Sequence, residues 1–186
     1  MGKQRWWLVA LVVLVLAAGF SYFALPWRPW RTRRQLPPGP SNGTEVTLYF
    51  VNREYITTGN EELPKLLPFT RRIMVQGDGR TGRESLVTKV LAELRKPPAG
   101  AEVTTALRDD LRITGVRVEE TTVYVDFSSD NLHGGSLEEI LLVEQVVMTL
   151  TGLPGLEKVQ FLVDGERRDT LMGHVSADEP LGPDDF

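Results

Sequence analysis

The sequence predicts an α/β (α+β) fold, a two-layer sandwich in which two helices pack on one face of a mixed, mostly antiparallel sheet, with an N-terminal transmembrane helix. Short segments carry apolar residues at every second position, as half-buried strands do, and two longer segments carry them three and four positions apart, as helices do. The predicted order β-β-α-β-β-α-β favours a layer of helices on a sheet. An uncharged run of 18 residues near the N-terminus predicts the membrane helix.

The uncharged run, Trp6–Phe23, is predicted to be an anchor, and residues 1–23 are assigned to it. As a helix it would extend about 27 Å, close to the roughly 30 Å hydrocarbon core of a bilayer. A cleaved signal peptide is the alternative, but bulky residues and further apolar sequence follow the best cleavage site at Ala17–Gly19. Basic residues flank the run almost equally, and we expect the N-terminus inside and the rest of the chain outside.

Residues 24–43 are predicted to be a proline-rich basic linker, because five prolines favour extended geometry. Residues 1–43 contain six basic and no acidic residues, out of 21 basic and 25 acidic residues in the chain, so residues 44–186 carry a net charge of −10. A domain this acidic is not expected to bind nucleic acid, which requires clustered Lys and Arg. The absence of cysteine excludes disulfides, a thiolate nucleophile and an acylated-cysteine anchor in this sequence.

The first half of the domain contains two predicted strands and one helix. Val46–Val51 is rich in β-branched and aromatic residues, and residues 72–76 form a second short apolar segment after a loop. Apolar residues recur at helical spacing over residues 83–95, and Pro97 and Pro98 end the helix.

The second half repeats the pattern with a hairpin, a helix and a strand. Apolar and polar residues alternate over residues 112–127, which predicts two antiparallel strands with one solvated face. A capping-box pattern at Ser136–Glu139 predicts a helix that continues to about Leu150. Residues 159–163 alternate again as a last core strand, and the acidic tail, residues 178–186, is expected to be loose at its end.

Three features could carry chemistry, and for each we favour an ordinary structural role. Gly77–Gly82 matches G-x-G-x-x-G, but Asp78 would repel phosphates and no doubly wound sheet follows. His133 and His174 have no partners at metal-ligand spacing. Asp126 and Asp130 could serve as a carboxylate pair, but turn-forming residues surround them.

We therefore expect no catalytic, cofactor-binding or metal-binding residues and no enzymatic activity. The second helix has one further feature, a predicted polar face formed by Glu138, Gln145 and Thr149. Leu142 lies among these residues and is expected to be exposed, either as an ordinary surface leucine or as part of a partner-facing edge.

The order of several segments resembles the GerMN domain family of GerM-like sporulation and spore germination proteins. The segments are VTLYFVN (46–52), ESLVTKVLAEL (84–94), VYVDFS (123–128), VEQVVMTLTGLPGLEKVQFLVDGE (143–166) and LMGHVSADEPL (171–181). Residues 44–182 are assigned to this GerMN-like domain, and residues 183–186 to an acidic tail. Many relatives are lipoproteins, whereas this chain has no cysteine to acylate, and it has room for one such domain where others have two.

The resemblance implies a non-catalytic, extracytoplasmic protein-interaction module that supports sporulation or germination. The chain would be a single-pass protein of the cell membrane, with its domain in the cell envelope, or in the intermembrane space of a sporulating cell. The expected partners are the membrane and an envelope protein or peptidoglycan. A peptidoglycan-binding or peptidoglycan-modifying protein is the alternative function.

Overall fold

The computed structural model describes residues 43–75 and 79–186, which belong to one compact unit, Ser41–Phe186. The predicted anchor, residues 1–23, and all of the predicted linker except Gly43 lie outside the described residues. No helix within residues 43–75 and 79–186 has the length and apolar character needed to cross a membrane. The elements are β1 (Gly43–Asn52), α2 (Arg53–Thr58), β2 (Leu66–Met74), α3 (Gly79–Leu94), β3 (Val103–Thr104), β4 (Ile113–Glu119), β5 (Thr122–Phe127), α4 (Ser136–Thr151), β6 (Lys158–Val163) and the 3-10 turn η1 (Pro183–Asp185).

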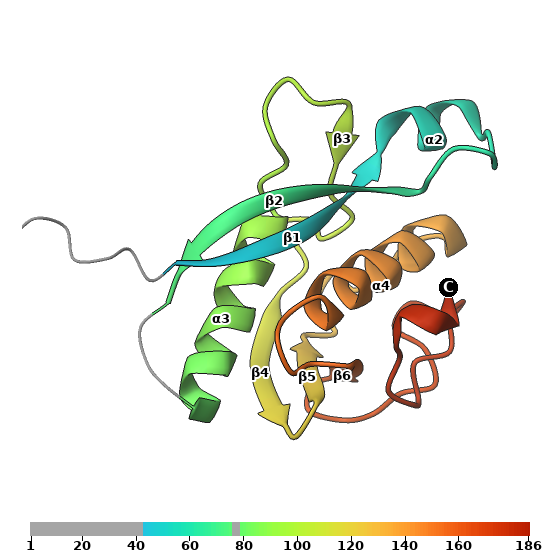
Figure 1. Cartoon of the computed structure of the whole chain (residues 1–186). Coiled ribbons are helices and arrows are strands. Elements are labelled where there is room, and N and C mark those ends of the chain that lie inside the picture. The colour runs from blue at the N-terminus through green and yellow to red at the C-terminus, as the bar shows by residue number, and fades with distance from the viewer. Residues whose placement is uncertain (1–42, 76–78) are drawn as a thin grey trace, which may run out of the picture. The chain divides into compact units, whose positions relative to one another are not determined.

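The strands form two separate three-stranded sheets, where we had predicted one (Figure 1). One sheet has the order β2-β1-β3 and is antiparallel throughout, and the other has the order β4-β5-β6 with β5 and β6 parallel. The pairing of β1 with β3 spans two residues. After it, the backbone N–H groups of Ala106 and Leu107 donate to a side chain of α4. The first sheet therefore does not continue into β4.

Both long helices contact both sheets, so they do not cover one face of a single sheet as predicted. α3 packs against β1 and β4, and α4 packs against β1 and β6. The predicted apolar stripe of α3 is buried at Val87, Val90, Leu91 and Leu94. Alternate residues of β1, β5 and β6 meet these helices in one core. Burial of this apolar surface is the main force that holds the two sheets together.

The predicted hairpin, helix and last strand all form where the sequence placed them. The hairpin is β4–β5, the helix is α4, and the strand is β6. The helix cap differs in detail, because Gly135 is the cap residue and its N–H donates to the Glu138 carboxylate at 2.9 Å. The acidic side chain near the positive end of the helix also favours this start.

Two short elements and the extent of β2 were not predicted. α2 begins after Asn52, whose side chain accepts from Glu54 N at 3.0 Å, and ends at Gly59 with a left-handed φ of 65°. β2 starts six residues before the predicted Arg72 and includes Pro68, which is tolerated because β2 is an edge strand.

The C-terminal segment is more ordered than predicted for residues 178–186. Leu181 and Val159 exchange two backbone hydrogen bonds of 2.8 Å each, and η1 follows. The side chain of Gln160 on β6 donates to Ala177 O at 2.9 Å. The C-terminal segment therefore pairs with the open edge of β6 at Val159 and covers Gln160, while α4 packs against the same strand.

Candidate functional site

Asp126 and Asp130, the candidate carboxylate pair, have separate partners. Oδ1 of Asp126 accepts from Gly165 N at 2.9 Å and Oδ2 accepts from Thr114 Oγ1 at 2.7 Å. The exposed carboxylate of Asp130 lies 3.9 Å from Arg112 Nη1. Asp126 thus fastens the turn after β6 to β5.

Both histidines lie in exposed loop positions, as expected, but their neighbours differ. The ring of His174 lies against Glu139, with Nδ1 3.0 Å from Oε2. Glu139 is fully buried, and its carboxylate also accepts the backbone N–H groups of Leu171, Met172 and His174 at 2.7–2.9 Å. This arrangement fastens the C-terminal segment to α4. Sequence reasoning assigned Glu139 only to the capping pattern and missed this role.

The predicted polar face of α4 is largely a buried contact surface, so the prediction of an exposed Leu142 was wrong. Leu142, Gln145 and Thr149 are all completely buried. Gln145 Oε1 accepts from Ala106 N at 2.8 Å, while its Nε2 donates to Tyr49 O at 2.8 Å. These polar side chains satisfy backbone groups of β1 and of the loop after β3, which is why they are buried.

The glycine-rich segment is only partly described. Gly79 begins α3 with a left-handed φ of 62°, and Gly82 lies within that helix. Gly77 and Asp78 lie outside the described residues. Across residues 43–75 and 79–186 there is no group of three or more His, Asp or Glu side chains that could hold a metal ion.

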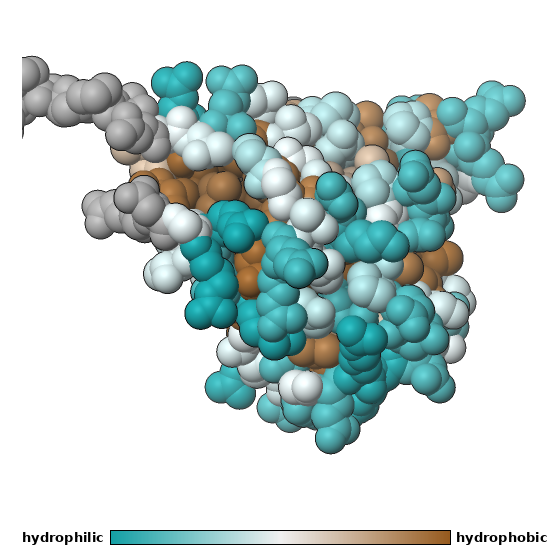
Figure 2. Space-filling view, turned by 60° about the horizontal axis from the view of Figure 1, so that its bottom comes forward, coloured by the Kyte–Doolittle hydropathy of each residue, from teal (hydrophilic) through white to brown (hydrophobic). Residues whose placement is uncertain are grey.

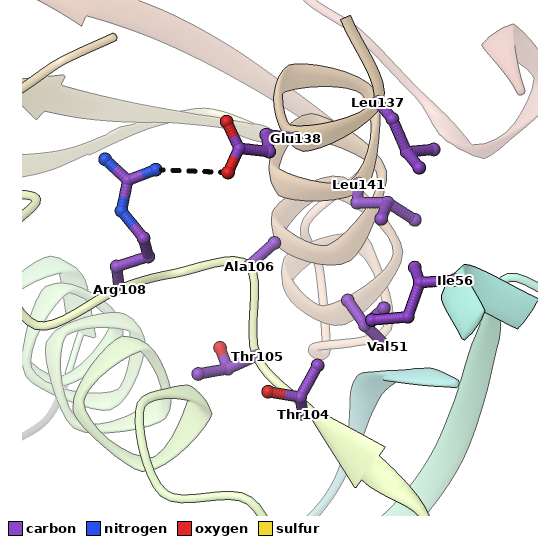
Figure 3. Close-up of a pocket in the computed structure, with 9 residues that line it drawn as sticks. All are labelled: Val51, Ile56, Thr104, Thr105, Ala106, Arg108, Leu137, Glu138 and Leu141. Atoms are coloured by element: carbon purple, nitrogen blue, oxygen red, sulfur yellow. Dashed lines mark ion pairs between the residues drawn. The ribbon is translucent and has the colours of Figure 1, made fainter. Parts of the chain in front are cut away.

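The feature that sequence reasoning did not find is an apolar groove of about 260 Å³ between α2, the β3 loop and the start of α4 (Figure 3). We call it the Ile56–Leu137 groove. Its floor is formed by Val51 and Leu141, which are buried. The side chains of Ile56 on α2 and Leu137 on α4 form two opposite walls of the groove (Figure 3). They are 41% and 43% exposed.

An ion pair lies beside these apolar residues. Arg108 Nη1 is 3.9 Å from Glu138 Oε1 (Figure 3). Arg108 Nε also donates to Asp110 Oδ1 at 3.1 Å. Arg95 at the end of α3 fixes this loop by donating to the carbonyls of Arg108 and Leu111. The hydrogen bond from Arg108 lowers the pKa of Asp110 below its ordinary value.

Each wall of the groove is held by a specific contact. The Asn52 cap orients α2, and the Asn52 side chain also donates to Pro64 O at 3.0 Å. Gln145 holds the backbone of residues 105–107 against α4. Because both contacts involve largely buried side chains, the groove is preformed. It offers an apolar surface next to one positive and one negative charge, with no arrangement of nucleophile and base among its lining residues.

Apolar side chains are exposed in one other region that matters for experiments. Figure 2 shows hydrophobic residues gathered next to the point where the described chain begins. There Met74 pairs with Gly43 across β1 and β2, and its side chain is 53% exposed. Met74 therefore provides a control position outside the groove.

The comparisons agree with the resemblance seen in the sequence. No curated protein matches the chain. Solved structures that share the fold include a candidate lipoprotein from Clostridium perfringens, with 21% identity and a TM-score of 0.51 over 77% of this chain and 89% of that one. They also include the first GerMN domain of the sporulation protein GerM from Bacillus subtilis, with 17% identity and a TM-score of 0.57 over 76% of this chain and 98% of that one. The tandem GerMN domains of GerM match with 19% identity and a TM-score of 0.51 over 75% of this chain and 44% of that one. This chain thus spans less than half of the tandem protein.

A family model also matches most of the domain. The model for the Germane family, described as sporulation and spore germination, matches residues 47–169. These residues include every strand except the first four positions of β1, together with α2, α3 and α4. The chain therefore belongs to the Germane family of sporulation and spore germination.

Proposed function

We propose that this chain is a membrane-anchored, extracytoplasmic protein-interaction module without catalytic activity, and that it acts in sporulation or spore germination through the Ile56–Leu137 groove. The observation that carries the proposal is the groove itself. Two large apolar side chains are exposed on opposite walls of a preformed hollow whose floor is also apolar. Such surfaces mark contacts with other proteins more often than isolated exposed residues do.

The non-catalytic part of the proposal is supported by the partners of the candidate chemical groups. Both oxygens of Asp126 and both oxygens of Glu139 accept structural hydrogen bonds. His174 lies against Glu139 at 3.0 Å and not against a hydroxyl nucleophile. These side chains hold the fold together, and removing any of them should change stability first.

The groove is tested by substitution in the organism that encodes the chain. Leu137→Glu places a charge at an exposed position in the first turn of α4, where an acidic residue is compatible with the helix. We expect spore yield or germination to fall to the level of a deletion strain while the amount of protein, measured by immunoblot, stays unchanged. Met74→Glu is the matched control, because it adds the same charge at an exposed apolar position outside the groove.

Wild-type sporulation and germination with both Leu137→Glu and Ile56→Glu would reject the groove as a functional surface. The anchor and its direction need a separate test. A reporter that is active only in the cytoplasm, fused to the C-terminus, should be inactive if Trp6–Phe23 holds the domain outside. Activity of that fusion would contradict the proposed location.

A further inference from the structure

A second hollow, of about 600 Å³, shares no lining residue with the Ile56–Leu137 groove. Its lining includes Tyr49 on β1, Tyr55 on α2 and Met148 on α4. These three side chains are half-buried and pack against a small second core cluster of the domain. We call it the Tyr49–Tyr55 hollow. Its apolar surface therefore rests on a firm base and stays partly open to solvent.

The phenol hydroxyl groups of both tyrosines are unused within the domain. Tyr49 makes its hydrogen bonds through its backbone, with Thr149 Oγ1 and Gln145 Nε2, and the Tyr55 carbonyl accepts from Gly59 N. Among residues 43–75 and 79–186, neither hydroxyl has a partner, and neither is a buried group that lacks one. Both hydroxyls are therefore open to solvent and can donate a hydrogen bond to a ligand.

One carboxylate of the hollow has no basic partner. Lys65 and Glu144 form an ion pair of 2.8 Å, and their side chains are 36% and 13% exposed. Glu61 is exposed and forms no ion pair within the described part of the chain. The three charged side chains of the lining therefore sum to −1, in a domain whose residues 44–186 carry a net charge of −10. A ligand with positive charge matches this surface.

These groups together define the chemistry of the ligand. The tyrosine rings and Met148 suit apolar rings, the two free hydroxyls suit carbonyl acceptors, and Glu61 suits Arg or Lys. A proline-rich basic segment combines all three, because proline supplies an apolar ring and the polyproline geometry leaves its carbonyls free. Such segments dock in aromatic-lined grooves with little loss of entropy, since their geometry is preformed. Peptidoglycan fits less well, because the carboxylates of its peptide stems would meet Glu61.

We propose that the Tyr49–Tyr55 hollow binds a proline-rich, basic segment of a partner protein, with prolines against the two tyrosines and an arginine or lysine beside Glu61. The hollow is separate from the Ile56–Leu137 groove, so it adds a second contact surface to the proposed interaction module. The inference does not depend on the groove and is tested on its own.

The test uses residues 41–186, a compact unit with its own core that matches 98% of a GerMN domain solved alone. The probe is a fluorescein-labelled peptide in which arginine alternates with pairs of prolines. Fluorescence anisotropy should show saturable binding with a dissociation constant on the order of 0.1 mM, as expected for a short peptide in one hollow. A peptide with alanine in place of proline should bind at least about fivefold more weakly, and one with glutamate in place of arginine should not bind.

Substitutions then locate the binding in the hollow. Tyr55→Phe removes only the hydroxyl and should weaken binding by about three- to tenfold, whereas Tyr124→Phe on β5, outside the hollow, should leave it unchanged. Glu61→Lys should abolish binding of the arginine peptide and allow the glutamate peptide to bind. Glu62→Lys is the matched control, because Glu62 is adjacent and exposed but does not line the hollow, and it should change either dissociation constant by no more than about twofold. Melting curves show that each variant keeps its fold.

Three results would overturn the inference. The first is the absence of saturable binding of the arginine–proline peptide up to about 2 mM. The second is an equal effect of Glu61→Lys and Glu62→Lys, which would show a general attraction to an acidic domain. The third is a response of Tyr49 and Tyr55 in NMR spectra to soluble peptidoglycan fragments but not to the peptide. None of these results bears on the Leu137→Glu test of the proposed function, because the two surfaces have no residue in common.

Discussion

Gln145 is the residue at which the structure departs most clearly from the helical pattern of the sequence, and it provides the sharpest test. Gln145 is completely buried in α4, and its amide joins three parts of the fold. Oε1 accepts from Ala106 N at 2.8 Å and from Thr105 Oγ1 at 3.2 Å, while Nε2 donates to Tyr49 O at 2.8 Å. Replacing it with leucine keeps a side chain of similar size but leaves these groups without a partner.

The magnitude follows from the groups that lose their partners. A buried backbone N–H or C=O without a hydrogen bond costs about 1–3 kcal/mol, and Gln145→Leu leaves one of each, at Ala106 and Tyr49. The added apolar contact offsets part of this cost. We expect the free energy of unfolding to fall by about 2–4 kcal/mol. For a domain of this size the melting temperature would fall by roughly 5–15 °C.

The assay is urea denaturation of residues 41–186, followed by circular dichroism. Thr88→Leu is the matched control, because it introduces the same residue on the exposed face of α3 and should change stability by no more than about 0.5 kcal/mol. If Gln145→Leu were neutral or stabilising, the side chain would lie on a solvated face, as the sequence pattern suggested, and the network described above would be wrong.

Three further predictions concern the contacts around the groove and the C-terminal segment. Glu139→Ala should release residues 171–174, because backbone N–H groups in this segment lose the buried carboxylate that accepts from them. Amide hydrogen exchange in the segment should rise, and the free energy of unfolding should fall by about 2–5 kcal/mol. Unchanged exchange would contradict the role of Glu139. Asn52→Ala should lower the free energy of unfolding by about 1 kcal/mol in urea denaturation, because α2 loses its cap. Thr88→Ala on the exposed face of α3 is the control and should change stability by no more than about 0.5 kcal/mol, and an equally small change for Asn52→Ala would contradict the role of the cap. The pKa of Asp110, measured by NMR, should lie below its ordinary value of 3.8, because Arg108 donates a hydrogen bond to the carboxylate. This contact stabilises the fold fully above pH 3.8, and the stabilisation is lost as the pH falls through the lowered pKa of the folded state. An ordinary pKa would show that the pair does not persist in solution.

Much of the fold was predictable because local patterns determine local structure. Alternating apolar residues identified β5 and β6, and the β-branched and aromatic residues of Val46–Val51 identified β1. The spacing of Val87, Val90 and Leu94 identified α3. α2 was missed because β-branched residues at positions 56–58 resemble a strand or loop, although Asn52 and Gly59 are ordinary helix-capping residues.

The candidate site was less predictable, because its residues are far apart in the chain. Val51, Ala106 and Leu137 meet only after β1, the β3 loop and α4 have packed. No periodicity in the sequence relates these positions. The buried roles of Gln145 and Glu139 were also hidden, since a polar residue on a helix is usually solvated and only its partners show otherwise.

The sequence by itself therefore determined the family resemblance, the core positions of the main strands and helices, and the predicted tether that precedes the domain. The tertiary structure decided that the strands divide into two sheets, that Leu142 is covered, and that Ile56 and Leu137 remain exposed on facing walls. The physical reason is that burial depends on what packs against a helix. The sequence pattern of α4 identifies its apolar residues. Its polar residues Gln145 and Glu139 are covered by the loop after β3 and by the C-terminal segment, which are distant in the chain, so no local pattern predicts their burial.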